Sequence, residues 1–121
     1  MEYKSFEEMP VWQKAMELAV EIFNITENLP RKEDYGLTSQ LRSSGLSVSG
    51  NISERFGRKH TNDKLRFYYN ARGSLAETKN HLIYGFRIGY FIKAQYEECS
   101  SLVKEIWKEL NSIINSLSRK S

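Results

Sequence analysis

The residues best suited to chemistry are few, and their spacing does not assemble a site. His60 and His81 are the two histidines, and neither is followed four residues later by the Cys, Asp or Glu of a helical metal site. Glu77 precedes His81 by four residues, whereas di-iron bundles use a Glu-x-x-His spacing on two helices. The single cysteine, Cys99, falls on an apolar row typical of a buried, unreactive thiol.

Motifs for nucleophilic and phosphate chemistry are also missing. The serines between residues 39 and 53 have no G-x-S-x-G turn and no histidine close by in sequence. Neither G-x-x-x-x-G-K-[ST] nor G-x-G-x-x-G occurs, so no phosphate-binding loop is visible. The sequence therefore predicts no enzyme, no metal, no cofactor and no small-molecule substrate.

Basic residues are concentrated in the middle of the chain. Residues 42–93 hold ten Lys and Arg against three acids, a net of +7, and the rest holds eight basic and twelve acidic residues, a net of −4. A basic patch is typical of a surface that binds nucleic-acid backbone. The alternatives are a solvated surface and cations that pair with acids of a neighbouring subunit. The candidate nucleic-acid-binding residues are Arg42, Arg55, Arg58, Lys59, Lys64 and Arg66.

Aromatic residues accompany these charges. Phe56, Phe67, Tyr68 and Tyr69 have the ring faces on which single-strand binders stack bases. Aromatic residues at helical spacing are more often part of a core or an interface, and we favour that interpretation. No base-reading motif is present, so we expect any binding to follow the phosphate backbone with little sequence preference.

Four amphipathic segments must position these side chains. Heptad-like apolar rows predict helices at about 10–29, 34–56, 61–90 and 94–117, with Pro10 in the first turn and Leu29-Pro30 ending the first helix. Gly45 and Gly50 weaken the second helix, so we expect its small residues to permit close approach of a neighbour. Short connections favour antiparallel neighbours. The prediction is an all-α fold: a single antiparallel up-down-up-down four-helix bundle over residues 1–121.

The first and third helices carry a second apolar row beside the core row. Such width suits either a broad core or the contact surface of an oligomer, and its presence on two helices favours the oligomer. The candidate interface residues in these rows are Trp12, Met16, Phe23, Tyr69, Ile83 and Tyr90.

The cellular compartment is predicted from absences in the sequence. No apolar run approaches the roughly 20 residues needed to span a bilayer. Residues 1–8 lack the basic and then apolar pattern of a secretory signal, and one cysteine suits a reducing compartment. We therefore expect a cytoplasmic protein without a membrane partner.

Five segments, in order and register, resemble a known family. They are residues 9–15 (MPVWQKA), 35–42 (YGLTSQLR), 51–54 (NISE), 57–58 (GR) and 73–77 (GSLAE). Together they resemble the bacterial four-helix bundle family first noticed as reading frames inside 23S ribosomal RNA intervening sequences. The accessory variability proteins of diversity-generating retroelements are similar to this family.

The resemblance implies a bundle that assembles into a ring, typically a homopentamer, and it supplies no catalytic residues. For the retroelement members it also implies a basic surface that contacts nucleic acid and a reverse transcriptase. Two functions of different classes remain open: a nucleic-acid-associated oligomer, and a protein–protein scaffold with no nucleic-acid role.

Overall fold

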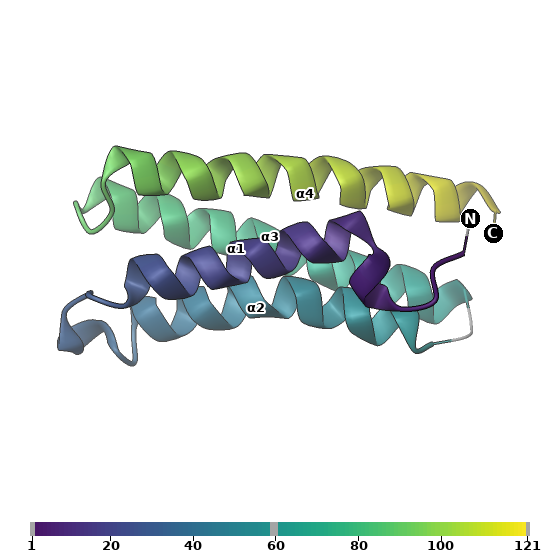
Figure 1. The fold of residues 1–121 in the computed structure, drawn as a ribbon, viewed down its shortest axis with the longest axis horizontal. Coiled ribbons are helices and arrows are strands. Elements are labelled where there is room, and N and C mark those ends of the chain that lie inside the picture. The colour runs from purple at the N-terminus through teal and green to yellow at the C-terminus, as the bar shows by residue number, and fades with distance from the viewer. Residues whose placement is uncertain (1, 59–60, 121) are drawn as a thin grey trace.

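The computed structural model describes residues 2–58 and 61–120, and these form four long helices with two short 3-10 helices. Helices α1 and α2 are antiparallel neighbours, as are α2 and α3 and then α3 and α4, and α4 also packs on α1 (Figure 1). The predicted all-α up-down bundle is confirmed. The elements are η1 (Phe6–Glu8), α1 (Pro10–Thr26), η2 (Arg31–Glu33), α2 (Leu37–Phe56), α3 (Thr61–Arg87) and α4 (Lys93–Lys120).

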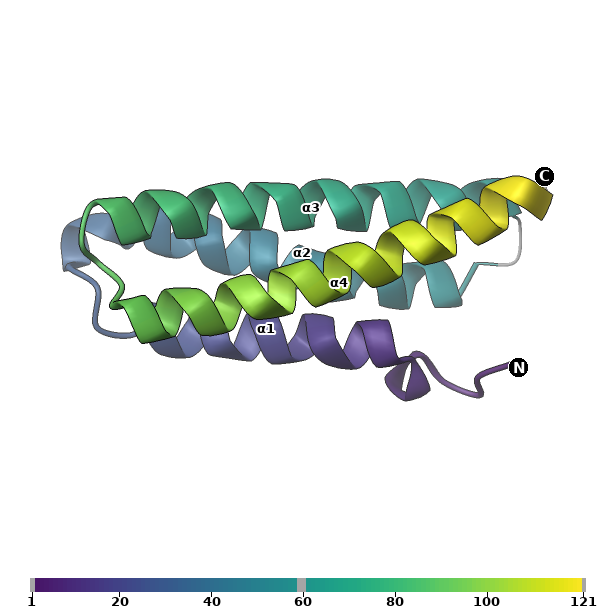
Figure 2. The ribbon, with the colours of Figure 1, turned by 90° about the horizontal axis from the view of Figure 1, so that it is seen from above.

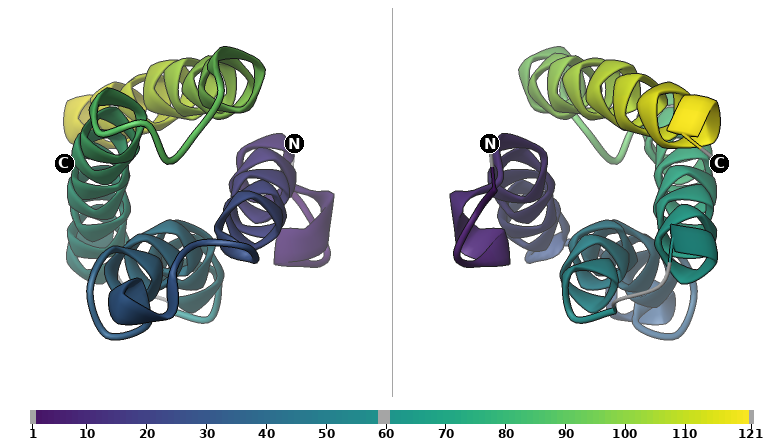
Figure 3. Two further views of the ribbon diagram at one scale, coloured as in Figure 1. Left: turned by 90° about the vertical axis from the view of Figure 1, so that its left-hand side faces the viewer. Right: turned by 90° about the vertical axis from the view of Figure 1, so that its right-hand side faces the viewer.

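Helix α4 is tilted relative to the other three. It starts beside α1 and approaches α3 toward its C-terminal end (Figure 2). Seen along the bundle, α1 and α3 lie diagonally opposite one another, with α2 and α4 between them (Figure 3). The tilt separates α4 from α1 at the end of the bundle that also carries both chain termini.

The core consists of the heptad rows expected from the sequence. On α1 the buried row is complete, with Ala15, Leu18 and Ile22 removed entirely from solvent. Burial of such side chains contributes roughly 1.5–3 kcal/mol each, which makes these rows the main source of stability. Matching rows on the other helices include Leu41, Val48, Ile52, Leu75, Leu82, Cys99, Ile106 and Leu110.

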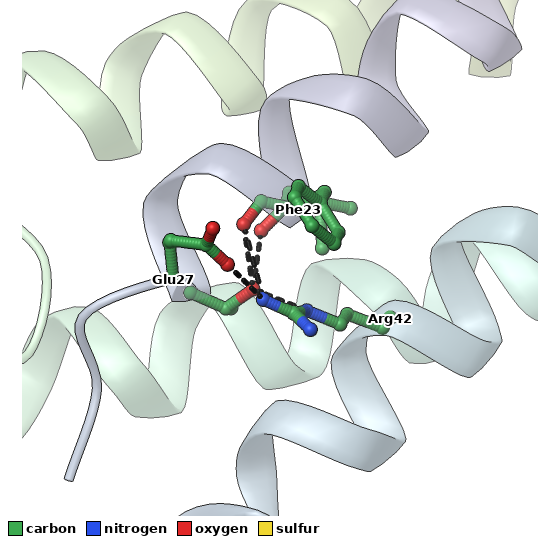
Figure 4. Close-up of polar contacts among 5 residues, drawn as sticks. Phe23, Glu27 and Arg42 are labelled. Carbon is green, nitrogen blue, oxygen red and sulfur yellow. Dashed lines mark hydrogen bonds and ion pairs between the residues drawn. The ribbon is translucent and has the colours of Figure 1, made fainter.

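Helix α1 ends at Thr26, three residues before the predicted end at Leu29. The Thr26 hydroxyl donates to the carbonyl of Ile22 at 2.7 Å and also lies 3.1 Å from the carbonyl of Phe23. Arg42 donates to Thr26 Oγ1 at 2.8 Å and to the Phe23 carbonyl at 3.3 Å (Figure 4). The side chains of Thr26 and Arg42 thus donate hydrogen bonds to the carbonyls of the last turn in place of backbone amides, and the helix ends there.

The other helix ends also differ from the prediction for local reasons. Helix α2 begins at Leu37 instead of Asp34, because Glu33 Oε1 accepts a hydrogen bond from the Leu37 amide at 3.1 Å. Helix α3 ends at Arg87, and Gly89 follows it with φ +85°. The amide of Tyr90 then donates to the Gly85 carbonyl at 2.9 Å, which completes a Schellman turn.

The small residues of α2 have two different explanations. A Cβ on Gly45 would lie 2.7 Å from Cδ1 of the buried Ile22, so the predicted close approach of a neighbouring helix is confirmed here. At Gly50 the prediction is wrong, since a Cβ there would meet nothing within 4 Å. Toward α3, hydroxyl pairs replace apolar contacts: Thr78 donates to Ser44 at 2.9 Å, and Ser74 donates to Ser47 at 3.0 Å.

At the end of the bundle away from the chain termini, the carboxylate of Glu33 joins the α1–α2 connection to the α3–α4 connection. Tyr90 donates its hydroxyl hydrogen bond to Glu33 Oε2 at 2.8 Å, while Glu33 Oε1 caps α2. These bonds, that from Tyr90 foremost, lower the pKa of Glu33, and the same bond raises the pKa of Tyr90. The α1–α2 and α3–α4 connections are thereby held together.

Gly45 and Gly50 allow a matched test of helix packing. Gly50→Ala should raise the free energy of unfolding by about 1 kcal/mol, because alanine is the better helix former and the site is open. Gly45→Ala should instead lower it by about 1 kcal/mol, since the methyl group overpacks a buried contact. Chemical denaturation measures both. Ile22→Val deletes the Cδ1 atom that contacts residue 45, so adding it to Gly45→Ala should restore stability. A Gly45→Ala variant as stable as Gly50→Ala would contradict the close approach of α1 and α2.

Glu33 makes stability depend on acidity. Because its folded-state pKa lies below the ordinary value of 4.5, its contribution is complete above that value and is lost as pH falls through the folded pKa. Tyr90→Phe removes the main cause of the shift, so this variant should lose less stability between pH 7 and pH 3 than the wild type. Urea midpoints at both pH values test this. Tyr35→Phe, at a residue almost wholly exposed, is the control and should follow the wild type.

Candidate nucleic-acid interface

The structure gathers four of the predicted cations and separates one from them. Arg55, Arg58, Lys64 and Arg66 lie where α2 ends and α3 begins, and we call this set the basic end. Arg42 lies near the other end of α2 and clamps the last turn of α1. Lys59 lies outside the described residues.

Arg42 has a structural role in this bundle. Besides its bonds to Thr26 and Phe23, its guanidinium pairs with Glu27 at 3.3 Å and lies 4.3 Å from the centre of the Phe23 ring (Figure 4). A planar guanidinium can satisfy a ring face, a carbonyl and a carboxylate at once. Its distance along α2 from the basic end places it outside that surface.

Two arginines of the basic end share one aromatic ring. The guanidinium carbons of Arg58 and Arg66 lie 5.3 Å and 4.5 Å from the centre of Phe67. Each also has an acid close by in sequence: Arg58 lies 3.5 Å from Glu54 of α2, and Arg66 lies 3.8 Å from Asp63 of α3. Their side chains are 48% and 58% exposed, so these ion pairs are weak and open to exchange.

The other two cations line a groove. It measures about 680 Å³ and opens where the tilt of α4 spreads the helices; we call it the end groove. Arg55 crosses one wall with its guanidinium 5.4 Å from the Tyr68 ring, and its Nε is buried without a hydrogen-bond partner. The groove is lined by Glu2, Tyr3, Met9, Pro10, Val11, Arg55, Phe56, Lys64, Tyr68, Glu109, Ser112 and Ile113.

The aromatic residues near the charges mostly belong to the core. Tyr68 is 1% exposed and Phe67 is also buried, which confirms the core interpretation for both. Phe56 is half-buried and packs edge-on against Phe6, with ring centres 6.4 Å apart. Tyr69 differs, because it is 45% exposed.

The second apolar rows of α1 and α3 are only partly available to contact another subunit. Trp12 packs on Phe6 with ring centres 5.1 Å apart, and Tyr90 is bonded to Glu33, so both have partners within the chain. Phe23 and Tyr69 are about half exposed. Met16 and Ile83 are half-buried, and the assignment of these rows to an interface stays a prediction.

A further exposed apolar surface lies between α3 and α4. Trp107 of α4 is 42% exposed, whereas Val103 and Ile114 of the same helix are buried. Arg72 lies between Trp107 and Tyr69, 5.9 Å and 5.2 Å from their ring centres. A hollow of about 280 Å³ opens beside Trp107, lined by Leu75, Ala76, Lys79, Val103, Lys104 and Trp107.

The residues capable of chemistry are dispersed. His81 Nε2 lies 3.6 Å from Glu77 Oε2, beyond hydrogen-bond distance. Cys99 is buried, and burial, with Glu21 and Glu98 nearby, raises its pKa to about 12, so the thiol stays protonated at neutral pH. Over residues 2–58 and 61–120, no three His, Cys, Asp or Glu side chains are grouped to hold a metal ion. No helix among the described residues is long and apolar enough to cross a membrane.

Comparisons with known proteins agree with this architecture. A family model described as 23S rRNA-intervening sequence protein matches residues 7–112. A crystal structure at 1.70 Å of a protein of unknown function, assigned to the S23 ribosomal protein family of Bacteroides thetaiotaomicron, is similar in sequence and fold. The two chains are 30% identical with a TM-score of 0.78, over 86% of this chain and 97% of the other. Among curated proteins, none matches this chain.

Proposed function

The chain belongs to the 23S rRNA-intervening sequence protein family, and from that premise we propose that it is a non-catalytic, self-assembling bundle that binds RNA or DNA backbone. The binding surface is the basic end, where α2 meets α3. Arg42, which the sequence grouped with these cations, has no part in it.

The observation that carries the proposal is the arrangement of Arg58 and Arg66 around Phe67. Stacking on one ring holds both guanidinium groups in defined positions, which lowers the entropy lost when they bind a ligand. Their present partners are exposed carboxylates at 3.5 Å and 3.8 Å. A phosphate offers a guanidinium a better bidentate partner and would displace them.

Recognition at this end would read the backbone and not the sequence. The rings of Phe67 and Tyr68 are buried, so they cannot stack on several successive bases. Positive charge and guanidinium geometry remain, and these favour phosphate of any sequence. Single- and double-stranded RNA and DNA are all candidates on this basis.

Self-assembly is supported by apolar surface on two different sides of the bundle. One side, on α1 and α2, exposes Phe23 and Leu46; the other, on α3 and α4, exposes Tyr69 and Trp107. Because α1 and α3 are diagonally opposed, two unlike faces can meet head to tail, and such contacts form a ring when the rotation between successive subunits closes. A homopentamer is the ring that the family resemblance implies.

A scaffold without a nucleic-acid role is the second candidate. The specific observation in its favour is the Tyr69–Arg72–Trp107 stack, because aromatic and arginine side chains are enriched at protein interfaces. The two candidates share the assembly and differ in the role of the basic end.

Charge reversal at the basic end tests nucleic-acid binding. Affinity for unspecific RNA or DNA should fall steeply with salt, because binding releases counterions. Arg58→Glu with Arg66→Glu should weaken binding at least tenfold at about 100 mM salt and reduce the slope of log K against log salt by about 2. Fluorescence anisotropy measures both quantities.

The matched control carries the same charge change at the far end. Arg31 and Lys32 are exposed in η2, so Arg31→Glu with Lys32→Glu should retain most of the affinity. Equal losses in both double variants would contradict a localised surface. A wild type that binds no nucleic acid even at low salt would leave the scaffold as the function.

Light scattering coupled to gel filtration tests the assembly. The wild type should elute at several times 14.2 kDa, with a pentamer expected. Leu46→Glu and Trp107→Glu each place a charge on one face without disturbing the core, and each should yield smaller species. Ile92→Glu, at an exposed apolar residue just before α4, is the control. A wild type near 14 kDa at micromolar concentration would contradict self-assembly.

A further inference from the structure

The end groove is a formed site in its own right. We propose that it binds a single nucleotide, with the phosphate against Arg55 and Lys64 and the base against the apolar walls. The nucleotide is either a free one or one unit of a strand held on the basic end, and the second source rests on the proposed function.

The size of the groove suits such a ligand. Small-molecule sites usually measure about 300–1,000 Å³, and the end groove is about 680 Å³. It is bounded by the N-terminal segment and by the ends of all four helices. Residues of all four helices line it, so it is a feature of the bundle itself.

Two polar atoms in its lining lack the partners that buried groups normally have. Arg55 Nε is a donor without an acceptor, and Glu109 Oε2 is an acceptor without a donor. The other oxygen of Glu109 accepts from Lys14 Nζ at 3.3 Å, which holds the carboxylate in place. A ligand that satisfies both must bring an acceptor and a donor together.

The walls between these atoms are apolar and aromatic. Met9, Val11, Phe56 and Ile113 supply the apolar surface, and Tyr3 and Tyr68 are the aromatic residues with a hydroxyl in the lining. A nucleotide combines the required parts: an anionic phosphate, a flat ring, and amino or hydroxyl donors for Glu109. Inorganic phosphate lacks the ring, and a fatty acid lacks the donor.

The groove is continuous with the basic end. Arg55 and Lys64 line it, and Arg58 and Arg66 lie on the same end of the bundle. A strand bound at Arg58 and Arg66 can extend to Arg55 and Lys64, and one unpaired nucleotide can then enter the groove at the cost of its stacking.

Titration of the full chain with AMP, UMP and inorganic phosphate, followed by amide chemical shifts in NMR, tests the site directly. We expect both nucleotides to bind, with shifts confined to the groove lining, and phosphate to bind at least tenfold more weakly. Lys64→Gln and Glu109→Gln each remove a charge but keep a polar side chain. Each should lower the affinity for AMP at least fivefold. Ile113→Trp should abolish binding by filling the groove.

The same titration with a short single-stranded RNA separates this inference from the proposed function. The double variant Arg58→Gln with Arg66→Gln should lower the affinity for RNA and leave the affinity for AMP unchanged. Binding of RNA without AMP and without shifts in the groove lining, or binding of phosphate as tightly as AMP, overturns the nucleotide site while the basic end survives. Binding of AMP without RNA overturns the basic end and assigns the groove to a free nucleotide. Melting curves by circular dichroism confirm that each variant is folded.

Discussion

The small side chains of α2 are the constraint on which the rest of the bundle depends, because they let neighbouring helices pack closely against it. With glycine at position 45, its backbone lies close enough to α1 that a methyl group would overlap Ile22. On its other side, hydrogen bonds from Ser74 and Thr78 to serines of α2 join α3 to it. Helix α4 crosses the bundle at a tilt. Close packing on one side and divergence on the other together place the end groove.

The sequence predicted the helices and their core well because both follow from local periodicity. The row from Val11 to Ile25 is buried as expected, and so is Cys99. Helix ends were less predictable, since they depend on contacts from elsewhere: Arg42 on the last turn of α1, and Tyr90 on the carboxylate that caps α2. Gly50 shows the same limit, because composition alone cannot distinguish an open glycine from a packed one.

The candidate site was predictable in part. Sequence proximity to the α2–α3 connection brought Arg55, Arg58, Lys64 and Arg66 together, whereas Arg42 was misplaced because charge counting ignores its distance along the helix. The end groove had no sequence signature. It joins Glu109 of α4 to residues about 50 and 100 positions earlier, and such a grouping depends on tertiary packing.

The buried hydroxyls between α2 and α3 have a consequence for folding specificity. A heptad pattern is nearly unchanged when one helix slides by a turn, so burial of apolar residues distinguishes such registers poorly. The Thr78–Ser44 and Ser74–Ser47 bonds do distinguish them, because both pairs form together in the native register, whereas a slip of one turn leaves at most one of these two α3 hydroxyls opposite a serine of α2. These two bonds therefore favour one register of α3 against α2. They add little to the stability of the native state, but they make the alternative registers less stable.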